Sequence, residues 1–434
     1  MMRRLNIFFI FLSGFCLLLN AKPVGLGNIG NSCFCNALTQ NLVNLEPCTK
    51  LLFRYYEVWC CVPVVKDYLS LLRALTGMRE KGTESFSGSE LTMWYNTVQR
   101  QLFQTTNYNQ QDASELWNKF WSRLDIVSFC QKFLVQKRSG IDAFLKTSYF
   151  ADFSKKFAET FCTKVDRGSL GKEFMDLLYI WLQTQVSVQN EEFSYKSKTD
   201  EFCSSISVPV VGNTLESCLG EFFAVENVER ILHSGTKVEG KDGISVELTS
   251  QFRTNNAKKQ FFLTNSGDCL IIHLKRFTWD LKKIGTPVSI PISLDMTPYF
   301  LTKTKSDDYY RYHLIGVVAH SGTLNYGHYW AYINDLYADQ DAWYRCDDSS
   351  VRTMDKSGVS DNAYMVFYLR ESKVKEIRST QGRDSLKKAK KTMEHIINEE
   401  ERKRREAEER RLEEERTRLL IQKLAASLAE IAAS

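Results

Sequence analysis

The sequence lacks the paired cysteines that would mark a structural zinc site. None of the twelve cysteines in the 434 residues is spaced CxxC from another. A zinc site takes its ligands from closely spaced Cys and His pairs, and a chain of this length does not need disulfides to hold a core. We therefore predict that most of the cysteines are buried apolar side chains, and that the protein binds no metal and needs no cofactor.

The body of the chain also lacks an excess of charge. The formal net charge is +5, but residues 373–434 contain 17 Lys and Arg against 13 Asp and Glu, so the first 372 residues carry only +1. Proteins that bind the phosphate backbone of nucleic acids present a strongly basic surface. A nearly neutral body gives no reason to expect a nucleic-acid partner.

Long apolar runs are absent except near the N-terminus. There Arg3 and Arg4 precede a largely apolar run over residues 5–19, and Asn20 and Ala21 follow the run. This is the layout of a secretory signal peptide, and about 15 residues are few for a membrane span, which needs about 20. We predict a signal peptide over residues 1–21, cleaved after Ala21, with an uncleaved membrane anchor as the alternative.

The apolar pattern changes from helical to strand-like along residues 22–371, which we predict to form one domain. In QQDASELWNKFWSRLDIV the apolar residues recur at helical spacing, and Ser87 or Ser89 is a candidate N-cap for another helix. The second half contains short β-branched and aromatic runs, namely SSISVPVV, CLIIHLKRF, YHLIGVVAHSG, GHYWAYIND and AYMVFYLR. Helices followed by strands predict an α+β fold with a cleft between two lobes.

Residues 372–434 are predicted to form a charged helical tail. The stretch EEERKRREAEERRLEEERTR has only Ala407 and Leu412 as apolar residues, and Glu repeatedly precedes Lys or Arg by four positions, the favourable order for ion pairs on a helix. Such a helix has no face to bury. The last turns carry an apolar stripe made of Leu420, Leu424, Leu428 and Ile431. We predict a solvated spacer whose tip could join a partner helix, although two or three apolar turns fall short of what a coiled coil needs.

Cys33 differs from the other cysteines because it lies between a turn and a helix. The preceding stretch GNIGNS is rich in Gly, Asn and Ser, and CNALTQNLVNL continues as an amphipathic helix. The N-terminus of a helix favours the thiolate, which is the nucleophilic form of cysteine. Taken alone, the pattern also fits a structural cysteine.

The stretch VGLGNIGNSCFCNALTQNL resembles the Cys box of the ubiquitin-specific proteases, a family of papain-like deubiquitinating enzymes. NQQDASELW and CLIIHLKRFTWD resemble two further elements of this family, and YHLIGVVAHSGTLNYGHYWAYIND resembles its His box, followed by WYRCDDSSV. Because four elements occur in the family's order over residues 24–369, the chain is identified as a member of the family. We further expect an exported bacterial member of the family, because the leader directs the domain out of the cell that makes it.

The resemblance implies a catalytic set made of Cys33 as nucleophile, His328 as general base, Asp347 as the carboxylate that orients it, and Asn28 as an oxyanion donor. The chemistry agrees, since a Cys/His pair generates thiolate at neutral pH and a carboxylate fixes the imidazole. A side-chain amide is a suitable donor to an oxyanion.

Two of these assignments have rivals nearby. Asp348 could replace or assist Asp347. His320 also lies in the His box, but we favour His328 as the base because Gly327 permits a close approach at the start of a strand.

The resemblance also predicts the substrate-binding residues. It places Gln110, Gln111 and Asp112 beside the catalytic cleft, and Gly327 and Tyr329 flank the predicted base. These five residues are therefore the predicted contacts for substrate.

The fold implied is a papain-like cysteine peptidase fold with a helical thumb, a β-rich palm and fingers. Many family members bind zinc in the fingers through two CxxC pairs, whereas residues 190–259 here hold only Cys203, Cys218 and His233. We therefore expect reduced fingers, in which either the zinc site is lost or the strands are short.

The predicted function is hydrolysis of (iso)peptide bonds after the C-terminal Gly of ubiquitin, with ubiquitin or ubiquitinated proteins as partners. The alternatives are a protease for another ubiquitin-like modifier and a catalytically dead ubiquitin-binding module. The four intact catalytic positions argue against the last.

The predicted compartment conflicts with the predicted substrate. Ubiquitin is cytosolic and nuclear, whereas the leader directs the domain out of the cytosol. Both fit a bacterium that lives within or on a eukaryotic host and exports the protein to the host cytosol. The alternative is a membrane-anchored eukaryotic enzyme whose domain faces the cytosol. In either case the membrane is contacted only through an uncleaved N-terminal segment.

Overall fold

The computed structural model describes residues 22–54, 62–123, 167–323, 326–336, 341–360 and 362–379, together with 402, 406 and 409–417. The predicted leader, the apolar stripe of the tail and Leu124 therefore lie outside the described residues. The chain divides into two compact units, one of which is Leu18–Arg383. None of the helices described is both long enough and apolar enough to span a bilayer.

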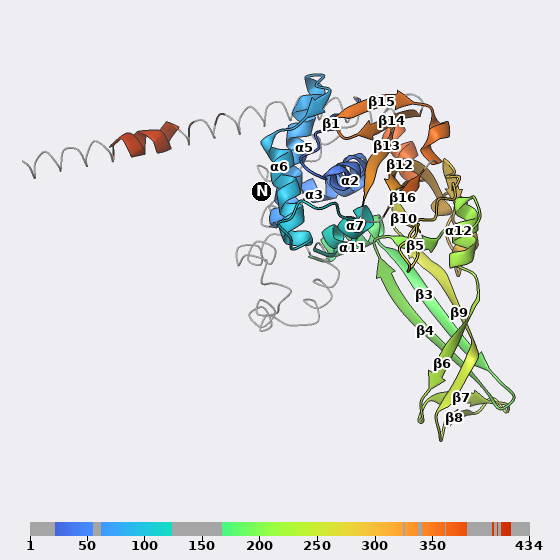
Figure 1. Cartoon of the computed structure of the whole chain (residues 1–434). Coiled ribbons are helices and arrows are strands. Elements are labelled where there is room, and N and C mark those ends of the chain that lie inside the picture. The colour runs from blue at the N-terminus through green and yellow to red at the C-terminus, as the bar shows by residue number, and fades with distance from the viewer. Residues whose placement is uncertain are drawn as a thin grey trace, which may run out of the picture. The chain divides into compact units, whose positions relative to one another are not determined.

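The first half of this unit forms the helical thumb (Figure 1). Its helices are α2 (Cys33–Asn44), α3 (Glu46–Arg54), α5 (Pro63–Glu80), α6 (Ser89–Thr97) with the π-helical turn Val98–Leu102, α7 (Ala113–Arg123) and α11 (Arg167–Leu178). The apolar residues predicted at helical spacing in α7 are buried, as an amphipathic helix requires. The predicted N-cap of α6 is wrong, because Gly88 occupies that position and no side chain caps the helix.

Helix α2 is the central element of the thumb, and all of its twelve residues are buried. Its buried asparagines bond to the backbone of neighbouring segments. Asn41 Nδ2 donates to the Val317 carbonyl at 3.3 Å, and Asn44 Nδ2 to the Ile315 carbonyl at 2.7 Å. Because unpaired buried amides are costly, these bonds fix α2 against the sheet lobe.

The palm is an eight-stranded sheet with the order β15-β14-β13-β12-β16-β10-β5, and β11 pairs with β12 outside this path. Its strands are β5 (Ile206–Pro209), β10 (Cys269–Lys275), β11 (Ser293–Asp295), β12 (Arg311–Gly322), β13 (Gly327–Asp335), β14 (Ala342–Asp347), β15 (Ser350–Met354) and β16 (Ala363–Arg370). All five strands predicted from the sequence are present, and the α+β prediction is confirmed. Every residue of β16 is buried, in keeping with its unbroken apolar and aromatic run.

Hairpins bring the predicted catalytic residues to one end of the palm. The β12–β13 hairpin pairs Ser321 with His328, and the β14–β15 hairpin pairs Asp347 with Ser350. A short parallel ladder of β1 (Gly25–Leu26) with β2 (Ser85–Phe86) holds the segment before α2. Shorter helices flank the sheet, namely α12 (Leu215–Phe222) and α13 (Glu371–Arg378).

The fingers are a second sheet with the order β6-β9-β3-β4-β7-β8, which extends away from the palm (Figure 1). Its strands are β3 (Ile180–Gln189), β4 (Phe193–Cys203), β6 (Glu226–Leu232), β7 (Lys237–Gly240), β8 (Ser245–Glu247) and β9 (Phe252–Ser266). Strands β3, β4 and β9 are 10, 11 and 15 residues long. The finger strands are therefore not short, and the fingers differ from the expected pattern in lacking paired zinc ligands.

A small hydrophobic cluster packs within the fingers. It consists of Val188, Phe193, Leu232, Val238 and Ala257. The candidate zinc ligands do not fit a metal site, because Cys218 packs in the main core of the palm and His233 is exposed. Apolar burial therefore contributes to the stability of this sheet.

The tail predicted over residues 372–434 has two main described parts. Residues 372–378 belong to α13, in which Val374 and Ile377 are buried, so this part is not a solvated spacer. Residues 409–417 are helical, and each of these residues is exposed. Arg402 pairs with Glu406 at 2.6 Å, and the Arg410 guanidinium donates to the Glu406 carbonyl at 3.1 Å. Over these residues the tail has the solvated, ion-paired character that the sequence predicts.

Candidate active site

The predicted nucleophile is the first residue of α2. The turn before it is folded around the Asn28 side-chain carbonyl, which accepts hydrogen bonds from the backbone N–H of Gly30 at 3.1 Å and of Ser32 at 3.2 Å. Gly30 has φ +99° and Asn31 has φ +53°, backbone conformations that favour Gly and Asn. The Gly/Asn-rich composition thus places Cys33 at a helix N-terminus, where the dipole favours negative charge.

His328 links Cys33 to Asp347. Its Nε2 lies 2.6 Å from Asp347 Oδ1, so Nδ1 is the ring nitrogen left to face the thiol. The pKa of His328 is raised to about 9, first by its hydrogen bond with Cys33 and, against the opposing effect of burial, by the hydrogen bond and charge of Asp347. The imidazole is therefore poised as a cation at neutral pH, as a thiolate–imidazolium pair requires.

His320, the rival for the base, has a different environment. It is 1% exposed, and burial, together with the positive charge of Lys283, lowers its pKa to about 4. A Cβ added to Gly327 would lie 2.1 Å from His320 Nε2. His320, on β12 of this hairpin, is thus a neutral core residue, and the lack of a side chain at Gly327 leaves room for its ring.

The two neighbouring aspartates have separate partners. Asp347 bonds to His328, whereas Asp348 accepts hydrogen bonds from Asn28 Nδ2 and Asn36 Nδ2, each at 2.8 Å. Asp348 has φ +47°, and its two carboxylate oxygens are each engaged by an asparagine. The sequence alone does not separate these two roles, although Asn28 and Asn36 in the Cys box indicate that a polar group accepts their hydrogen bonds.

The QQDA element joins the thumb to the His328 hairpin. Gln110 Oε1 accepts a hydrogen bond from the Gly327 N–H at 3.2 Å. Asp112 accepts from the Glu115 N–H at 2.8 Å at the start of α7, and its other oxygen accepts from Tyr329 at 3.4 Å and from Tyr364. Gln111 is half-buried in the same segment. The structure thus brings this segment to the predicted site, and its contact with substrate stays a prediction.

The only group of potential metal ligands among the described residues consists of His328, Asp347 and Asp348, whose ligand atoms lie within 4.8 Å of one another. The hydrogen bonds described above already occupy these atoms. The arrangement therefore fits proton transfer and hydrogen bonding better than metal coordination.

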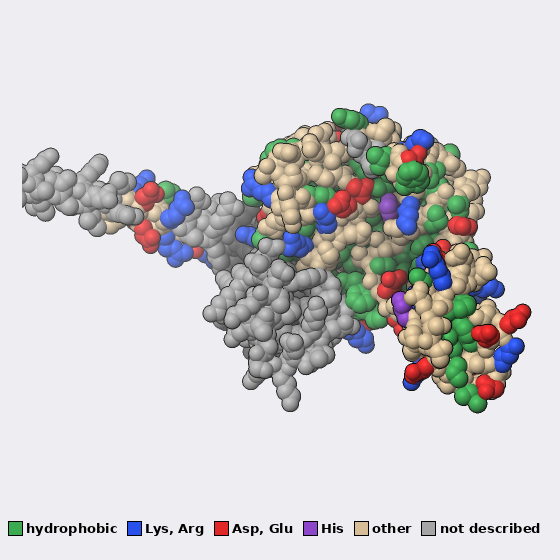
Figure 2. Space-filling view, turned by 60° about the horizontal axis from the view of Figure 1, so that its bottom comes forward, with side chains coloured by type: hydrophobic (Ala, Val, Ile, Leu, Met, Phe, Trp, Pro, Cys, Tyr) green, Lys and Arg blue, Asp and Glu red, His purple; other side chains and the backbone are tan. Residues whose placement is uncertain are grey.

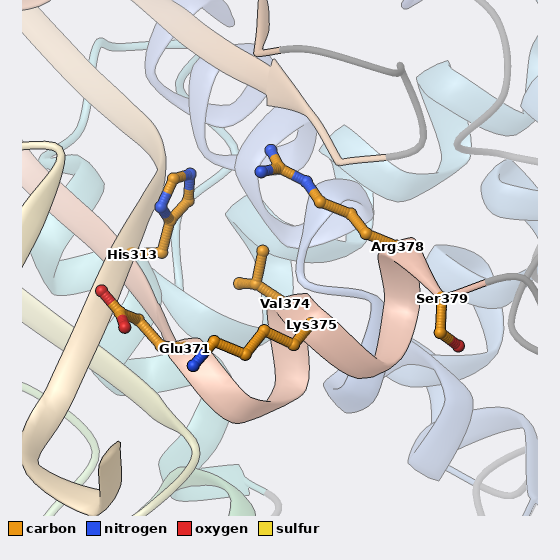
Figure 3. A pocket seen from close by; sticks show the side chains of 6 residues that line it. All are labelled: His313, Glu371, Val374, Lys375, Arg378 and Ser379. Carbon is orange, nitrogen blue, oxygen red and sulfur yellow. The ribbon is translucent and has the colours of Figure 1, made fainter. Parts of the chain in front are cut away.

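A surface pocket of about 390 Å³ lies beside α13 and shares no residue with this site (Figure 3). It is lined by His313, Glu371, Val374, Lys375, Arg378 and Ser379. Its charged side chains already have partners: Arg378 pairs with Asp341, and Lys375 pairs with Asp308 at 3.2 Å. We therefore place the chemistry at Cys33 and not in this pocket.

Figure 2 shows acidic and basic side chains interspersed on one face of the molecule, without a broad patch of one sign among the described residues.

The helical thumb and the β-rich palm agree with the papain-like α+β fold predicted from the sequence. Residues 24–368 match the family described as "Ubiquitin carboxyl-terminal hydrolase", and the chain belongs to this family. The catalytic roles of the individual residues stay predictions.

Similar proteins and structures agree with this membership. The chain is 26% identical over 368 residues to Ubiquitin carboxyl-terminal hydrolase 15 of Arabidopsis thaliana, covering 82% of this chain and 34% of that protein. It is 41% identical over 119 residues to Ubiquitin carboxyl-terminal hydrolase 9 of the same plant, covering 26% of this chain and 13% of that protein. The chain thus spans less than half the length of the curated relatives it matches.

Two solved structures share the fold. The SAGA DUB module with Ubp8 bound to monoubiquitin has a TM-score of 0.56 and 20% identity, covering 80% of this chain and 68% of that chain. The same module bound to ubiquitin aldehyde has a TM-score of 0.54 and 19% identity, covering 80% of this chain and 69% of that chain. A related structure is from yeast.

Proposed function

We propose that the protein is a thiol-dependent deubiquitinase that hydrolyses (iso)peptide bonds after the C-terminal Gly of ubiquitin. The observation that carries this proposal is the contact of one imidazole, His328, with both Cys33 and Asp347. Membership of the ubiquitin carboxyl-terminal hydrolase family and the likeness to ubiquitin-bound structures support ubiquitin as the substrate.

The proposed reaction has two halves. The Cys33 thiolate attacks the carbonyl carbon of the terminal Gly, and the resulting oxyanion is stabilised by Asn28 Nδ2. An amide carries two N–H donors, and within the described residues only one is taken, by Asp348. The His328 imidazolium then gives its proton to the departing lysine amine as the C–N bond breaks. In the second half, His328 takes a proton from the water that attacks the thioester. The C–S bond breaks, the carboxylic acid leaves and ionises in solvent, and the Cys33 thiolate and His328 imidazolium are regenerated.

The direct test is cleavage of a fluorophore from the C-terminus of ubiquitin. Cys33→Ala is expected to lower kcat/KM by at least about 10⁴-fold. Cys203→Ala, which changes a half-buried thiol in the fingers, is the matched control and should remain active. Equal rates for wild type and Cys33→Ala would contradict the proposal.

Probes that react covalently with an active-site thiol distinguish this function from the two alternative functions. A ubiquitin probe that labels Cys33 supports the proposal, whereas labelling by another ubiquitin-like modifier alone indicates a protease for that modifier. Ubiquitin binding without labelling indicates a catalytically dead binding module.

We also propose that the protein is exported towards the cytosol of a host cell, with residues 1–21 as a cleaved signal peptide. The arginine pair and the short apolar run of the leader support this. Fractionation of the producing cells and of a host in contact with them tests the proposal. Protein found only inside the producer contradicts export, and protein in its membrane fraction indicates the anchored alternative.

For the tail we propose a spacer helix whose C-terminal stripe docks a partner helix. The exposure of residues 409–417 supports the spacer. Deletion of residues 419–434 should leave cleavage of the ubiquitin fluorophore unchanged, and loss of cleavage would assign the tail to the catalytic domain instead.

A further inference from the structure

His328 and Asp347 share one face of the palm with two other side chains, Trp330 and Arg345. Alternate residues of a strand point to the same face, so Trp330 lies beside His328 on β13, and Arg345 lies beside Asp347 on β14. The antiparallel register places Tyr332, which shares a face with Trp330, directly opposite Arg345. The side chains of His328 and Trp330 therefore lie on the same side of the sheet as those of Arg345 and Asp347. The four side chains therefore form one contiguous group.

Arg345 holds the carboxylate oxygen of Asp347 that His328 leaves free. Its Nη2 donates to Asp347 Oδ2 at 2.8 Å, while Oδ1 lies 2.6 Å from His328 Nε2. Burial opposes ionisation of Asp347, but the hydrogen bonds from His328 and Arg345 leave the pKa of this carboxyl below its ordinary value. With both oxygens engaged, the carboxylate cannot rotate without losing a charge-assisted hydrogen bond.

The indole of Trp330 contacts both Arg345 and His328. The Arg345 guanidinium lies 4.7 Å above the centroid of the indole, and the His328 ring stacks on the same indole at 6.1 Å with an interplanar angle of 28°. Trp330 is only 6% exposed and belongs to the main core, so its position is fixed by packing. A planar guanidinium stacks on an aromatic face and donates in fixed directions, which an ammonium group cannot do.

We propose that Arg345, held flat against Trp330, is a positioning residue that fixes the Asp347 carboxylate against His328 for the reaction at Cys33. The inference rests on the proposed function. Arg345 bonds to Asp347 and stacks on Trp330, so it acts on the reaction through Asp347. Nothing in the sequence pattern distinguishes it from a solvated strand residue.

The first test compares kcat for cleavage of the ubiquitin fluorophore. Arg345→Met, which removes charge and donors, is expected to lower kcat by about 10-fold or more with little change in KM, because an ångström of misplacement can cost about 100-fold. Arg345→Lys keeps the charge but not the planar fork, and should recover only part of the loss. Arg352→Met is the matched control, since Arg352 lies opposite Arg345 on β15, is exposed, and makes no hydrogen bond or ion pair within the described part of the chain.

The second test does not depend on ubiquitin. Alkylation of Cys33 by iodoacetamide, followed by mass spectrometry of the peptide that contains it, reports the pH at which the thiolate forms. In Arg345→Met the imidazolium loses a fixed carboxylate, so alkylation should move to higher pH than in wild type or Arg352→Met. Should Arg345→Met lower the melting temperature, Arg345→Lys supplies both measurements in a variant that keeps the charge and the aliphatic stem.

The outcomes separate the two proposals. A wild-type protein that cleaves no ubiquitin probe contradicts the proposed function, while the alkylation profile still tests Arg345. Normal cleavage together with unchanged kcat and an unchanged alkylation profile in the Arg345 variants overturns the positioning role. An equal loss in Arg352→Met overturns it too, because the effect would then be one of charge alone.

Discussion

Asn28 Nδ2 donates a 2.8 Å hydrogen bond to Asp348 Oδ2, across 320 residues of sequence. The bond ties the predicted oxyanion donor to the residue that follows the carboxylate of the predicted triad. Asp348 holds Asn36 through its other oxygen. One carboxylate thus positions the turn that precedes the nucleophile.

This relationship predicts coupled effects at Asn28 and Asp348. Asn28→Ala should lower kcat by about 10²–10³-fold with little effect on KM, as expected for loss of an oxyanion donor. Asp348→Ala should cause a smaller loss, because the donor remains but is no longer held. The double variant should be no worse than Asn28→Ala alone. Additive losses would show that Asp348 acts independently of Asn28.

The pH profile should reflect the raised pKa of His328. The folded-state value of about 9 exceeds the ordinary value of 6.5, so the imidazolium persists at neutral pH and is lost as the pH rises through about 9. We expect kcat/KM to fall on that alkaline limb, since the leaving amine then lacks its proton donor. The stabilisation contributed by the charged pair should be complete below pH 6.5 and lost over the same range.

A control for this assignment removes the largest cause of the shift. In Cys33→Ala the His328 pKa, followed by NMR, should fall below its wild-type value because the hydrogen bond with the thiol is gone. An unchanged His328 titration would mean that the imidazole does not face Cys33.

Gly327 should not tolerate a side chain. An added Cβ would lie 2.1 Å from His320 Nε2 and 2.7 Å from the Ser321 carbonyl oxygen, so Gly327→Ala should cost about 1–3 kcal/mol of unfolding free energy and displace His328. Gly285→Ala is the matched control, because no atom lies within 4 Å of its added Cβ. Denaturant unfolding and kcat/KM measure both effects, and similar results for the two variants would refute the steric argument.

The fingers should depend on apolar packing and not on metal. Phe193 is 7% exposed and contacts Phe252 with ring centroids 5.1 Å apart. Phe193→Ala should cost about 3 kcal/mol or more locally and raise KM for the ubiquitin substrate while kcat is largely kept. Ile244→Ala, at an exposed position in the turn between β7 and β8, is the control. A chelator should change neither parameter, and loss of activity on chelation would reveal a metal that these residues do not suggest.

Periodicity and turn chemistry were sufficient to predict much of the architecture. The strand runs were correct because their apolar residues are buried in a sheet. The position of Cys33 at a helix N-terminus followed from the Gly- and Asn-rich turn, which has two consecutive residues with positive φ. These features are local, so they can be read from a short stretch of chain.

Features that depend on tertiary contacts could not be predicted in the same way. Asp347 and Asp348 are chemically identical, and only their partners in the fold distinguish them: Asp347 bonds to His328, whereas Asp348 bonds to Asn28 and Asn36. Ser87 and Ser89 are both good N-cap residues, but the chain places Gly88 at that position. The finger strands are mostly polar and half-exposed, so they lack the alternation that marks a strand with one buried face.

The long separation between Asn28 and Asp348 also has a consequence during translation. The Leu26 N–H bonds to the Asp348 carbonyl, so the backbone and the side chain of one late residue both organise the segment that carries the thiol. A nascent chain has Cys33 early, but it lacks the His328 imidazole until β13 is made, and both carboxylates until the ribosome has passed the end of β14. Truncated products of stalled synthesis are therefore expected to be inert, and peptidase activity should arise only from chains whose domain is nearly complete.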